Sequence, residues 1–297
     1  MPINFTAAIT KLMTDRTILI TGCSSGIGLA SARMMKARGW RVLATARQPD
    51  DLKRLTEEYG LEALYLELAD SDAIAACAEE ALSRTGGRLY ALFNNAAYSQ
   101  PGAIEDVPAH ALRHQLEVNV VGTHDLTRRI IPAMRANGRG RIVQCSSVLG
   151  LISAPWRGAY CASKFALEAL TDALRLELQG SGIHVSLIEP GPIRPRFVEN
   201  ARAAAIANLD LENSVHRERY RQMLEPGTRR AADIQVGARS CRPQARACRR
   251  ESAAQGALPG DGPHVRCLGA QAHPANSLAR PGRNASLTAV HEPSGCA

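Results

Sequence analysis

TGCSSGIG, residues 21–28, is the stretch of sequence that decides the fold of this chain. The apolar run TILIT (residues 17–21) leads into it, and an amphipathic stretch (residues 28–38) leads out of it. A strand, a glycine-rich turn and a helix in immediate succession are typical of a dinucleotide-binding βαβ unit. The turn therefore predicts a phosphate-binding site at the start of the first helix.

The glycines of this turn have separate expected roles. Gly22 permits a tight turn, Gly26 lets the backbone approach a pyrophosphate, and Gly28 lets the helix pack closely on the sheet. Glycines also occur in turns that bind nothing, so the interpretation depends on the strand–turn–helix context. The residues of the turn that we expect to bind the cofactor are Gly22, Ser24, Ser25, Gly26, Ile27 and Gly28.

Apolar runs and amphipathic stretches alternate along the first 227 residues. Such alternation predicts right-handed βαβ units and therefore an α/β fold, a Rossmann-type doubly wound parallel sheet in three layers, α/β/α. The expected strands are residues 17–21, 41–46, 63–68, 90–94, 141–145 and 184–189. The expected helices include residues 28–38, 71–85, 109–137 and 160–179.

The chain has 297 residues and a net charge of +8, but the charge is unevenly distributed. Residues 228–297 contain ten Arg, no Lys, four acidic residues and no aromatic residue. Their apolar content is too low to offset the entropy lost on folding. We expect an N-terminal extension over residues 1–16, with Met13 as an alternative start, one dinucleotide-binding domain over residues 17–227, and an aberrant tail over residues 228–297.

Three interpretations of the tail remain open. It can be a disordered electrostatic segment, or the product of a shifted reading frame in a GC-rich gene, which tends to encode Arg, Ala, Pro and Gly. It can also be a nucleic-acid-binding arm, but it lacks aromatic side chains for base stacking and its arginines are dispersed. We therefore expect no nucleic-acid partner.

Signals for targeting and for metal binding are missing from the sequence. No apolar run is long enough to cross a bilayer, and the N-terminus lacks a signal-peptide pattern. The eight cysteines form no CxxC pair and no ligand-like cluster, so neither a disulfide scaffold nor a metal site is expected. A cytoplasmic location is the expectation.

The end of the second expected strand bears on the choice of cofactor. An acidic side chain there would accept a hydrogen bond from a ribose 2′-hydroxyl and would repel a 2′-phosphate. The chain has Thr45-Ala46-Arg47 and no carboxylate before Asp50. Arg47 can pair with a 2′-phosphate, or it can be an ordinary solvated arginine. NADP(H) is therefore favoured as the cofactor, with NAD(H) as the alternative.

Tyr160 and Lys164 lie four residues apart at the start of an amphipathic stretch, so they share one face of the expected helix. The ammonium is expected to depress the pKa of the phenol and to make it a usable acid or base near neutral pH. Ser147 ends a strand thirteen residues earlier, at the edge where open α/β sheets bind ligands. Together the three side chains predict a proton-transfer site.

In combination these motifs resemble the short-chain dehydrogenase/reductase family, over about residues 17–198. TGCSSGIG is similar to the family's TGxxxGxG, and Asn94-Asn95-Ala96-Ala97 is similar to its NNAG, with alanine in place of the last glycine. Pro190-Gly191 matches the family's PG after the sixth strand. The positions that match its catalytic tetrad are Asn119, Ser147, Tyr160 and Lys164.

The resemblance implies a role for each residue of the tetrad. Tyr160 would exchange a proton with the substrate oxygen while a hydride passes to or from the nicotinamide, and Ser147 would hydrogen-bond the same oxygen. Lys164 would bind the nicotinamide ribose, and Asn119 would support a water that relays protons to Lys164. Ser147 and Tyr160 are thus the expected substrate-binding residues.

The resemblance also implies further contacts to the cofactor. Glu67 stands where the family usually has an aspartate beside the adenine, and its side chain is longer. Pro195 stands where the family commonly has a threonine that holds the carboxamide; proline has neither hydroxyl nor N–H, so that contact is lost or passes to Ile193. The remaining expected cofactor-binding residues are Asn95, Ala96, Tyr160, Lys164, Pro190, Gly191 and Ile193.

Substrate and assembly are also inferred from the resemblance. YCASKFALEALTDALRLEL (residues 160–178) is similar to the branch that acts on steroids, retinoids and other apolar alcohols or carbonyls. A small apolar substrate is therefore expected, chosen by residues 193–225 and the tail. A homodimer or homotetramer is expected through helices at 109–137 and 159–180. The competing hypothesis is a catalytically impaired or non-catalytic dinucleotide-binding relic with a disrupted C-terminus.

Overall fold

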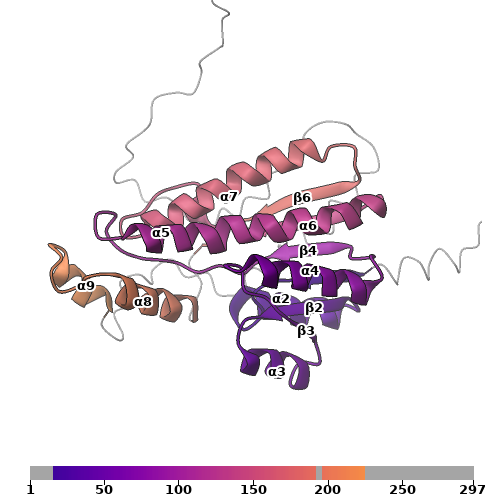
Figure 1. Ribbon diagram of the computed structural model, residues 1–297, viewed down its shortest axis with the longest axis horizontal. Coiled ribbons are helices and arrows are strands. Elements are labelled where there is room, and N and C mark those ends of the chain that lie inside the picture. The colour runs from indigo at the N-terminus through magenta and orange to yellow at the C-terminus, as the bar shows by residue number, and fades with distance from the viewer. Residues whose placement is uncertain (1–15, 192–195, 225–297) are drawn as a thin grey trace, which may run out of the picture.

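The computed structural model describes residues 16–191 and 196–224 (Figure 1). Within these ranges strands and helices alternate along the chain, as the sequence predicts. The expectations for Met13, Ile193, Pro195 and the tail at residues 228–297 lie outside the described residues and stay predictions.

Six parallel strands form one sheet in the order β3-β2-β1-β4-β5-β6. The chain begins in the middle of the sheet and winds outward in both directions, which confirms the expected doubly wound α/β fold. The strand bounds lie within one residue of the expected ones, except that β3 ends at Tyr65 and not at residue 68. Its neighbour β2 ends at Ala46 and offers no further ladder partner. The strands are β1 (Thr17–Ile20), β2 (Arg41–Ala46), β3 (Glu62–Tyr65), β4 (Ala91–Asn94), β5 (Gly140–Cys145) and β6 (Ile183–Ile188).

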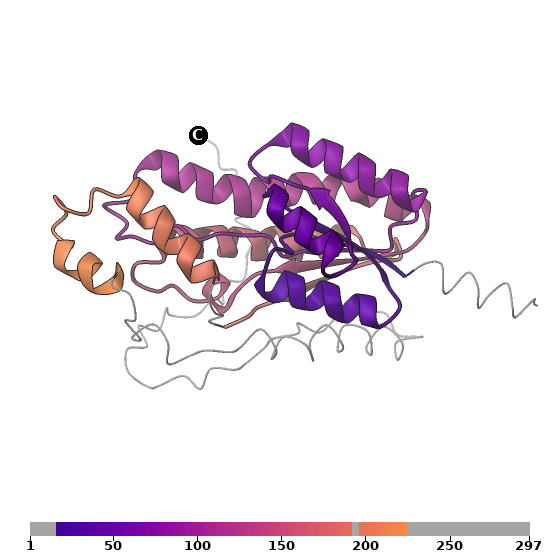
Figure 2. The ribbon, with the colours of Figure 1, turned by 90° about the horizontal axis from the view of Figure 1, so that it is seen from below.

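Helices cover both faces of this sheet and complete the three layers (Figures 1 and 2). Helices α4 and α6 bury Ile74 and Ile130 against one face, where α7 also packs through Leu174. Helices α2 and α3 bury Met35 and Leu55 against the other face. The α-helices are α2 (Gly26–Ala37), α3 (Pro49–Glu57), α4 (Ser71–Thr85), α5 (Ala109–Leu116), α6 (Thr123–Ala136), α7 (Gly158–Glu177), α8 (Arg196–Asn208) and α9 (Arg217–Leu224).

A π-helical turn, Glu117–Gly122, interrupts the single helix that the sequence predicts over residues 109–137. A Cβ on Gly122 would lie 2.0 Å from the carbonyl oxygen of Leu68, so the glycine lets this turn pack tightly against the chain that follows β3. Single π-helical turns within α-helices are frequent at functional sites. This π-helical turn carries Asn119. The sequence did not reveal it, because a single wider turn hardly changes the periodic pattern of apolar residues.

Helices α8 and α9 lie beside the loops at one end of the sheet, near the start of α7 (Figure 1). Ala205, Leu209 and Tyr220 are buried in a small apolar cluster, with Val107 and Trp156 packed against it. This cluster fixes α8 and α9 next to the sheet edge at which the strands end.

Candidate active site

Two glycines in the left-handed region shape the turn between β1 and α2, Gly22 (φ +69°) and Gly26 (φ +59°). A Cβ on Gly28 would lie 2.2 Å from the carbonyl oxygen of Gly22. A Cβ on Gly22 would lie 2.8 Å from the Cα of Ala96. Any side chain at Gly22 or Gly28 would therefore push backbone segments apart, which explains why this turn needs glycine at both positions.

The space in front of Gly26 fits a phosphate group. A Cβ built on Gly26 meets nothing within 4 Å, so this side of the turn is open. Ser25 begins α2 without a side-chain hydrogen bond to the helix, and the first N–H groups of a helix have no partner within it. Those N–H groups and the positive end of the helix dipole favour an anion. The turn therefore suits the pyrophosphate of a dinucleotide.

Thr21 and Asn95 fasten the turn to the end of β4. The Thr21 hydroxyl accepts hydrogen bonds from the backbone N–H groups of Asn95 and Ala96, both at 2.9 Å. Asn95 Nδ2 donates to the carbonyl oxygens of Thr21 (2.8 Å) and Gly22 (3.1 Å). The side chain of Asn95, which we expected to line the cofactor, thus holds the turn in shape.

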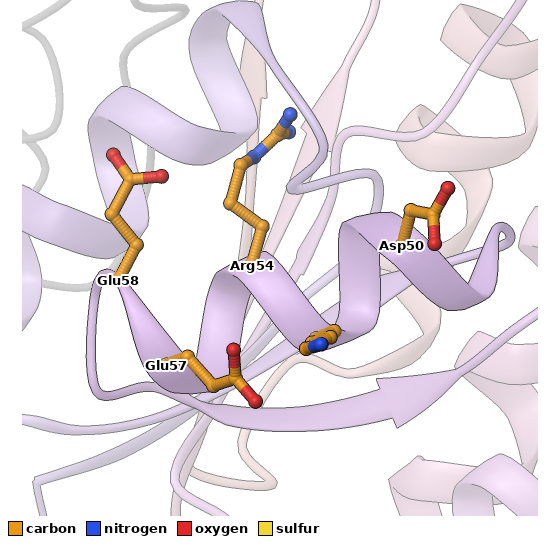
Figure 3. Close-up of a pocket in the computed structure, with 5 residues that line it drawn as sticks. Asp50, Arg54, Glu57 and Glu58 are labelled. Atoms are coloured by element: carbon orange, nitrogen blue, oxygen red, sulfur yellow. The ribbon is translucent and has the colours of Figure 1, made fainter.

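Arg54 supports the turn from α3, a contact that sequence reasoning missed. Its guanidinium donates to the carbonyl oxygen of Ser24 (2.5 Å) and pairs with Asp51 (2.7 Å). The pocket of about 270 Å³ in Figure 3 is lined by Asp50, Lys53, Arg54, Glu57 and Glu58. Because its lining is entirely charged and includes none of the tetrad, this pocket is not the candidate catalytic site.

Arg47 and Glu67 form an ion pair just beyond the carboxyl ends of β2 and β3. Arg47 Nη1 lies 3.2 Å from Glu67 Oε2, and the Arg47 side chain is 57% exposed. Arg47 is therefore accessible to a ligand, and its exposure also fits the ordinary solvated arginine of the alternative interpretation. Glu67 lies at the expected strand end, and its carboxylate faces Arg47.

Ser147 and Tyr160 meet at the carboxyl edge of the sheet. Ser147 follows β5 and begins the short 3-10 helix η2 (Val148–Gly150), where its hydroxyl accepts a hydrogen bond from the Leu149 N–H at 3.1 Å. Tyr160 lies in the first turn of α7, and its phenol is near enough to the Ser147 hydroxyl for that group to act on the pKa of the phenol. Both side chains are buried. The structure thus brings together the two hydroxyls that the sequence placed on separate elements.

The expectation that Lys164 depresses the pKa of Tyr160 is wrong for this structure. Burial raises the pKa of Tyr160, and the neighbouring Cys145 raises it further. The hydrogen bond with Ser147 and the charge of Arg157 act in the opposite direction, without reversing the shift. The Lys164 ammonium lies 5.6 Å from the centroid of the phenol ring and donates to the Cys145 carbonyl oxygen at 2.7 Å. Desolvation of the phenol, which favours its neutral form, therefore dominates.

Asn119 has all of its side-chain hydrogen bonds directed at neighbouring elements. Its Nδ2 donates to the carbonyl oxygen of Tyr98 (3.0 Å) and to Ser163 Oγ (3.1 Å), and its Oδ1 accepts from the Tyr98 N–H (3.1 Å). Ser163 directly precedes Lys164 on α7. Asn119 therefore braces the helix that carries Tyr160 and Lys164.

Pro190 lies directly against Ser147. Its carbonyl oxygen accepts hydrogen bonds from Ser147 Oγ (3.4 Å) and from the Val148 N–H (3.2 Å). Gly191 follows as the last described residue of this segment, and Ile193 lies outside the described residues. The Pro190-Gly191 pair thus follows β6 at the sheet edge where Ser147 lies.

Phe197 on α8 contacts the ring of Tyr160, and the sequence alone did not single it out. The two ring centroids are 5.7 Å apart with an interplanar angle of 66°, an edge-to-face arrangement. Phe197 belongs to the segment that we expected to set substrate choice. An aromatic residue in that segment was the sequence feature that could have indicated a contact with Tyr160.

Trp156 links the catalytic helix to α9. It precedes Tyr160 by four residues, and its ring packs edge-on against His216 (4.9 Å) and Tyr220 (5.7 Å). Trp156 has φ +66°, a value that is rare for a bulky side chain and needs support from its surroundings. The position of α9 is therefore coupled to the loop that leads into Tyr160.

Two further observations concern the described ranges 16–191 and 196–224. Within them, no group of three or more His, Cys, Asp or Glu side chains could hold a metal ion. No helix in this part of the chain combines the length and the apolar character needed to cross a membrane.

Comparison with known proteins identifies relatives over most of the described chain. The family described as short chain dehydrogenase matches residues 16–205. The Escherichia coli (strain K12) protein named Uncharacterized oxidoreductase YbbO is 48% identical over 195 residues, which cover 66% of this chain and 72% of that protein. Human 17-beta-hydroxysteroid dehydrogenase type 1 is 38% identical over 209 residues (67% and 63%), and mouse retinol dehydrogenase 16 is 36% identical over 213 residues (69% and 66%).

Solved structures with the same fold carry dinucleotides of both kinds. A short-chain dehydrogenase from Streptomyces avermitilis superposes with a TM-score of 0.66 at 31% identity, covering 82% of this chain and 86% of that one. A metagenomic short-chain oxidoreductase in complex with NADP (TM-score 0.58, 32% identity, 66% and 90%) and an NAD+-bound xylitol dehydrogenase (TM-score 0.58, 27% identity, 64% and 77%) are also similar. The chain therefore belongs to the short-chain dehydrogenase/reductase family and is an NAD(P)-dependent oxidoreductase, of a branch similar to the hydroxysteroid and retinol dehydrogenases.

Proposed function

We propose that this enzyme uses NADP(H) to interconvert an alcohol and a ketone or aldehyde on an apolar substrate, with Tyr160 as the general acid and base. The observation that carries the proposal is that the buried side chains of Ser147 and Tyr160 come together at the carboxyl edge of the sheet. Two buried hydroxyls that lie near each other can both bind one substrate oxygen, which is what proton transfer to a carbonyl requires.

Each side chain then has a defined task. Ser147 holds the substrate oxygen and stabilises the charge that develops on it. Tyr160 stays protonated because it is buried, so it can give its proton to that oxygen in the reducing direction. Lys164 holds the ribose of the cofactor, and Asn119 keeps α7 in place behind it. NADP(H), when bound, supplies or accepts the hydride.

The geometry of the site supports a cofactor position for several of the expected residues. The open turn at Gly26 supports binding of the pyrophosphate, and Pro190 and Gly191 lie beside Ser147. Arg47 is accessible at the end of β2, where a guanidinium can pair with a 2′-phosphate. We therefore favour NADP(H) over NAD(H).

An apolar substrate is supported by the side chains around Tyr160. Phe197 packs edge-on against its ring. Leu151 and Ile152, which follow Ser147 closely, are 43% and 61% exposed, so they do not belong to the core. Relatives named for hydroxysteroids and retinol point in the same direction.

Substitutions at three positions test this proposal. Tyr160→Phe removes the transferable proton and should lower kcat by about 10²- to 10⁴-fold, while the Kd for NADPH changes little. Ser147→Ala should lower kcat by about 10²-fold or more. Ser146→Ala is the matched control, because Ser146 is the adjacent buried serine and its Oγ has no hydrogen-bond partner among the described residues. Full turnover of a carbonyl panel by Tyr160→Phe would falsify the assigned role.

The proposal extends to organisation and assembly. We assign the reaction to residues 17–227, propose a cytoplasmic homodimer or homotetramer, and treat residues 228–297 as an aberrant tail. Size-exclusion chromatography with light scattering measures the assembly. Sequencing the gene around codons 226–260 decides between a genuine tail and a shifted reading frame.

A further inference from the structure

Two arginine–glutamate pairs bridge the neighbouring strands β2 and β3, one at each end. Arg41 and Glu62 begin the two strands and form two hydrogen bonds, Nε to Oε1 at 2.6 Å and Nη2 to Oε2 at 2.9 Å. Arg47 and Glu67 lie beyond the carboxyl ends and form one, Nη1 to Oε2 at 3.2 Å. The two pairs share chemistry and strands, but only the second lies at the edge that carries the phosphate-binding turn.

Glu67 is the more firmly held member of the second pair. Its Oε1 accepts a hydrogen bond from the Ala69 N–H at 3.1 Å, and its side chain is 23% exposed against 57% for Arg47. The carboxylate is therefore fixed by its own loop and faces the guanidinium, whereas Arg47 retains donors that point to solvent. A ligand phosphate that approaches Arg47 meets a fixed negative charge beside it.

We propose that Glu67 is a specificity-determining residue that limits the preference for NADP(H) over NAD(H). The inference rests on the proposed pairing of Arg47 with the 2′-phosphate. The Glu67 carboxylate neutralises part of the guanidinium charge and repels the phosphate dianion. NAD(H) has a 2′-hydroxyl at this position, so the same carboxylate costs it little. The pair thus makes the cofactor site more tolerant of both dinucleotides than Arg47 alone would.

Isothermal titration of the cofactor-free protein with NADPH and NADH tests this inference. Glu67→Gln keeps the size of the side chain and removes its charge, so the Kd for NADPH should fall about two- to fivefold, a range typical of exposed ion pairs. The Kd for NADH should stay within about twofold, and the gain for NADPH should shrink in about 1 M salt. Glu62→Gln is the matched control. It should leave both dissociation constants unchanged, because it makes the same change at the opposite end of strands β2 and β3.

Arg47→Gln separates failure of this inference from failure of the proposed cofactor. If Arg47→Gln raises the Kd for NADPH but Glu67→Gln does not lower it, the inference about Glu67 is wrong and the pairing of Arg47 with the 2′-phosphate stands. If Arg47→Gln leaves the Kd for NADPH unchanged, both the inference about Glu67 and the proposed pairing of Arg47 with the 2′-phosphate are wrong. A Glu67→Gln variant that binds NADPH more weakly, or that shifts both dinucleotides equally, would instead make Glu67 an orienting or adenine-binding residue and overturn the inference.

Discussion

Removal of one hydroxyl group should loosen the α8–α9 segment, which packs beside Tyr160 through Phe197. The Tyr220 hydroxyl donates to Asp106 Oδ2 at 2.6 Å and accepts from the Ala103 N–H at 2.8 Å. Burial and then Asp106 raise the pKa of Tyr220 to about 12, so the hydroxyl keeps its proton in any ordinary buffer. Tyr220→Phe keeps the ring that packs on Trp156 and deletes both hydrogen bonds.

The two lost hydrogen bonds set the expected magnitude for Tyr220→Phe. A bond to a carboxylate is worth about 1.5–3 kcal/mol and a neutral one about 0.5–1.5 kcal/mol. Asp106 is only half-buried and keeps a hydrogen bond from Ser214 at 2.7 Å, so we expect about 2 kcal/mol of destabilisation in urea unfolding. KM for an apolar carbonyl should rise more than kcat falls, because Trp156 joins this segment to the loop before Tyr160.

Tyr98→Phe is the matched control for this measurement. The Tyr98 hydroxyl is buried and has no hydrogen-bond partner among the described residues, so its removal should change the free energy of unfolding by less than about 0.5 kcal/mol or stabilise the fold. Equal stabilities of the Tyr220→Phe and Tyr98→Phe variants would refute the reasoning, since the two substitutions differ in the hydrogen bonds that they remove.

Two further predictions concern the reaction itself. Phe197→Ala should lower kcat/KM for bulky apolar ketones about tenfold or more and leave kcat/KM for small ketones unchanged, because it removes the aromatic ring that packs against Tyr160. Phe165→Ala, at a 43% exposed position on α7, is the control. An equal loss of kcat/KM on all substrates would contradict the prediction. Burial raises the pKa of Tyr160, so reduction, which needs the protonated phenol, should be nearly flat over about pH 6–8, whereas oxidation, which needs the phenolate, should rise with pH. Initial rates in both directions measure this, and oxidation that falls with rising pH would count against Tyr160 as the base.

The meeting of Ser147 and Tyr160 at one end of the strands was predictable to the extent that local sequence pattern controls it. Parallel strands end at one edge of a sheet, so Ser147 after β5 and Tyr160 at the start of the next helix had to approach each other. The tight packing at Gly22 and Gly28 likewise follows from the strand–turn–helix motif. The roles of the tetrad in catalysis stay predictions until the variants are measured.

Other features were hidden for identifiable reasons. Helix α3 begins with Pro49 and carries Asp50 and Asp51 in its first turn, which are ordinary start signals, but a stretch of only nine residues is short for the periodicity criterion. The hydrogen bond from Arg54 to the turn joins residues 30 positions apart, so no local pattern could reveal it.

The sequence by itself determined the α/β class, the parallel sheet, the glycine-rich turn after the first strand and the family, because each follows from the order of short motifs along the chain. Only the tertiary structure decided the electrostatics. A spacing of four residues places Lys164 and Tyr160 on one helix face, but the depth of burial and the neighbouring Cys145 side chain decide that the pKa of the phenol goes up. Energies of charged groups depend on three-dimensional surroundings that sequence distance does not encode.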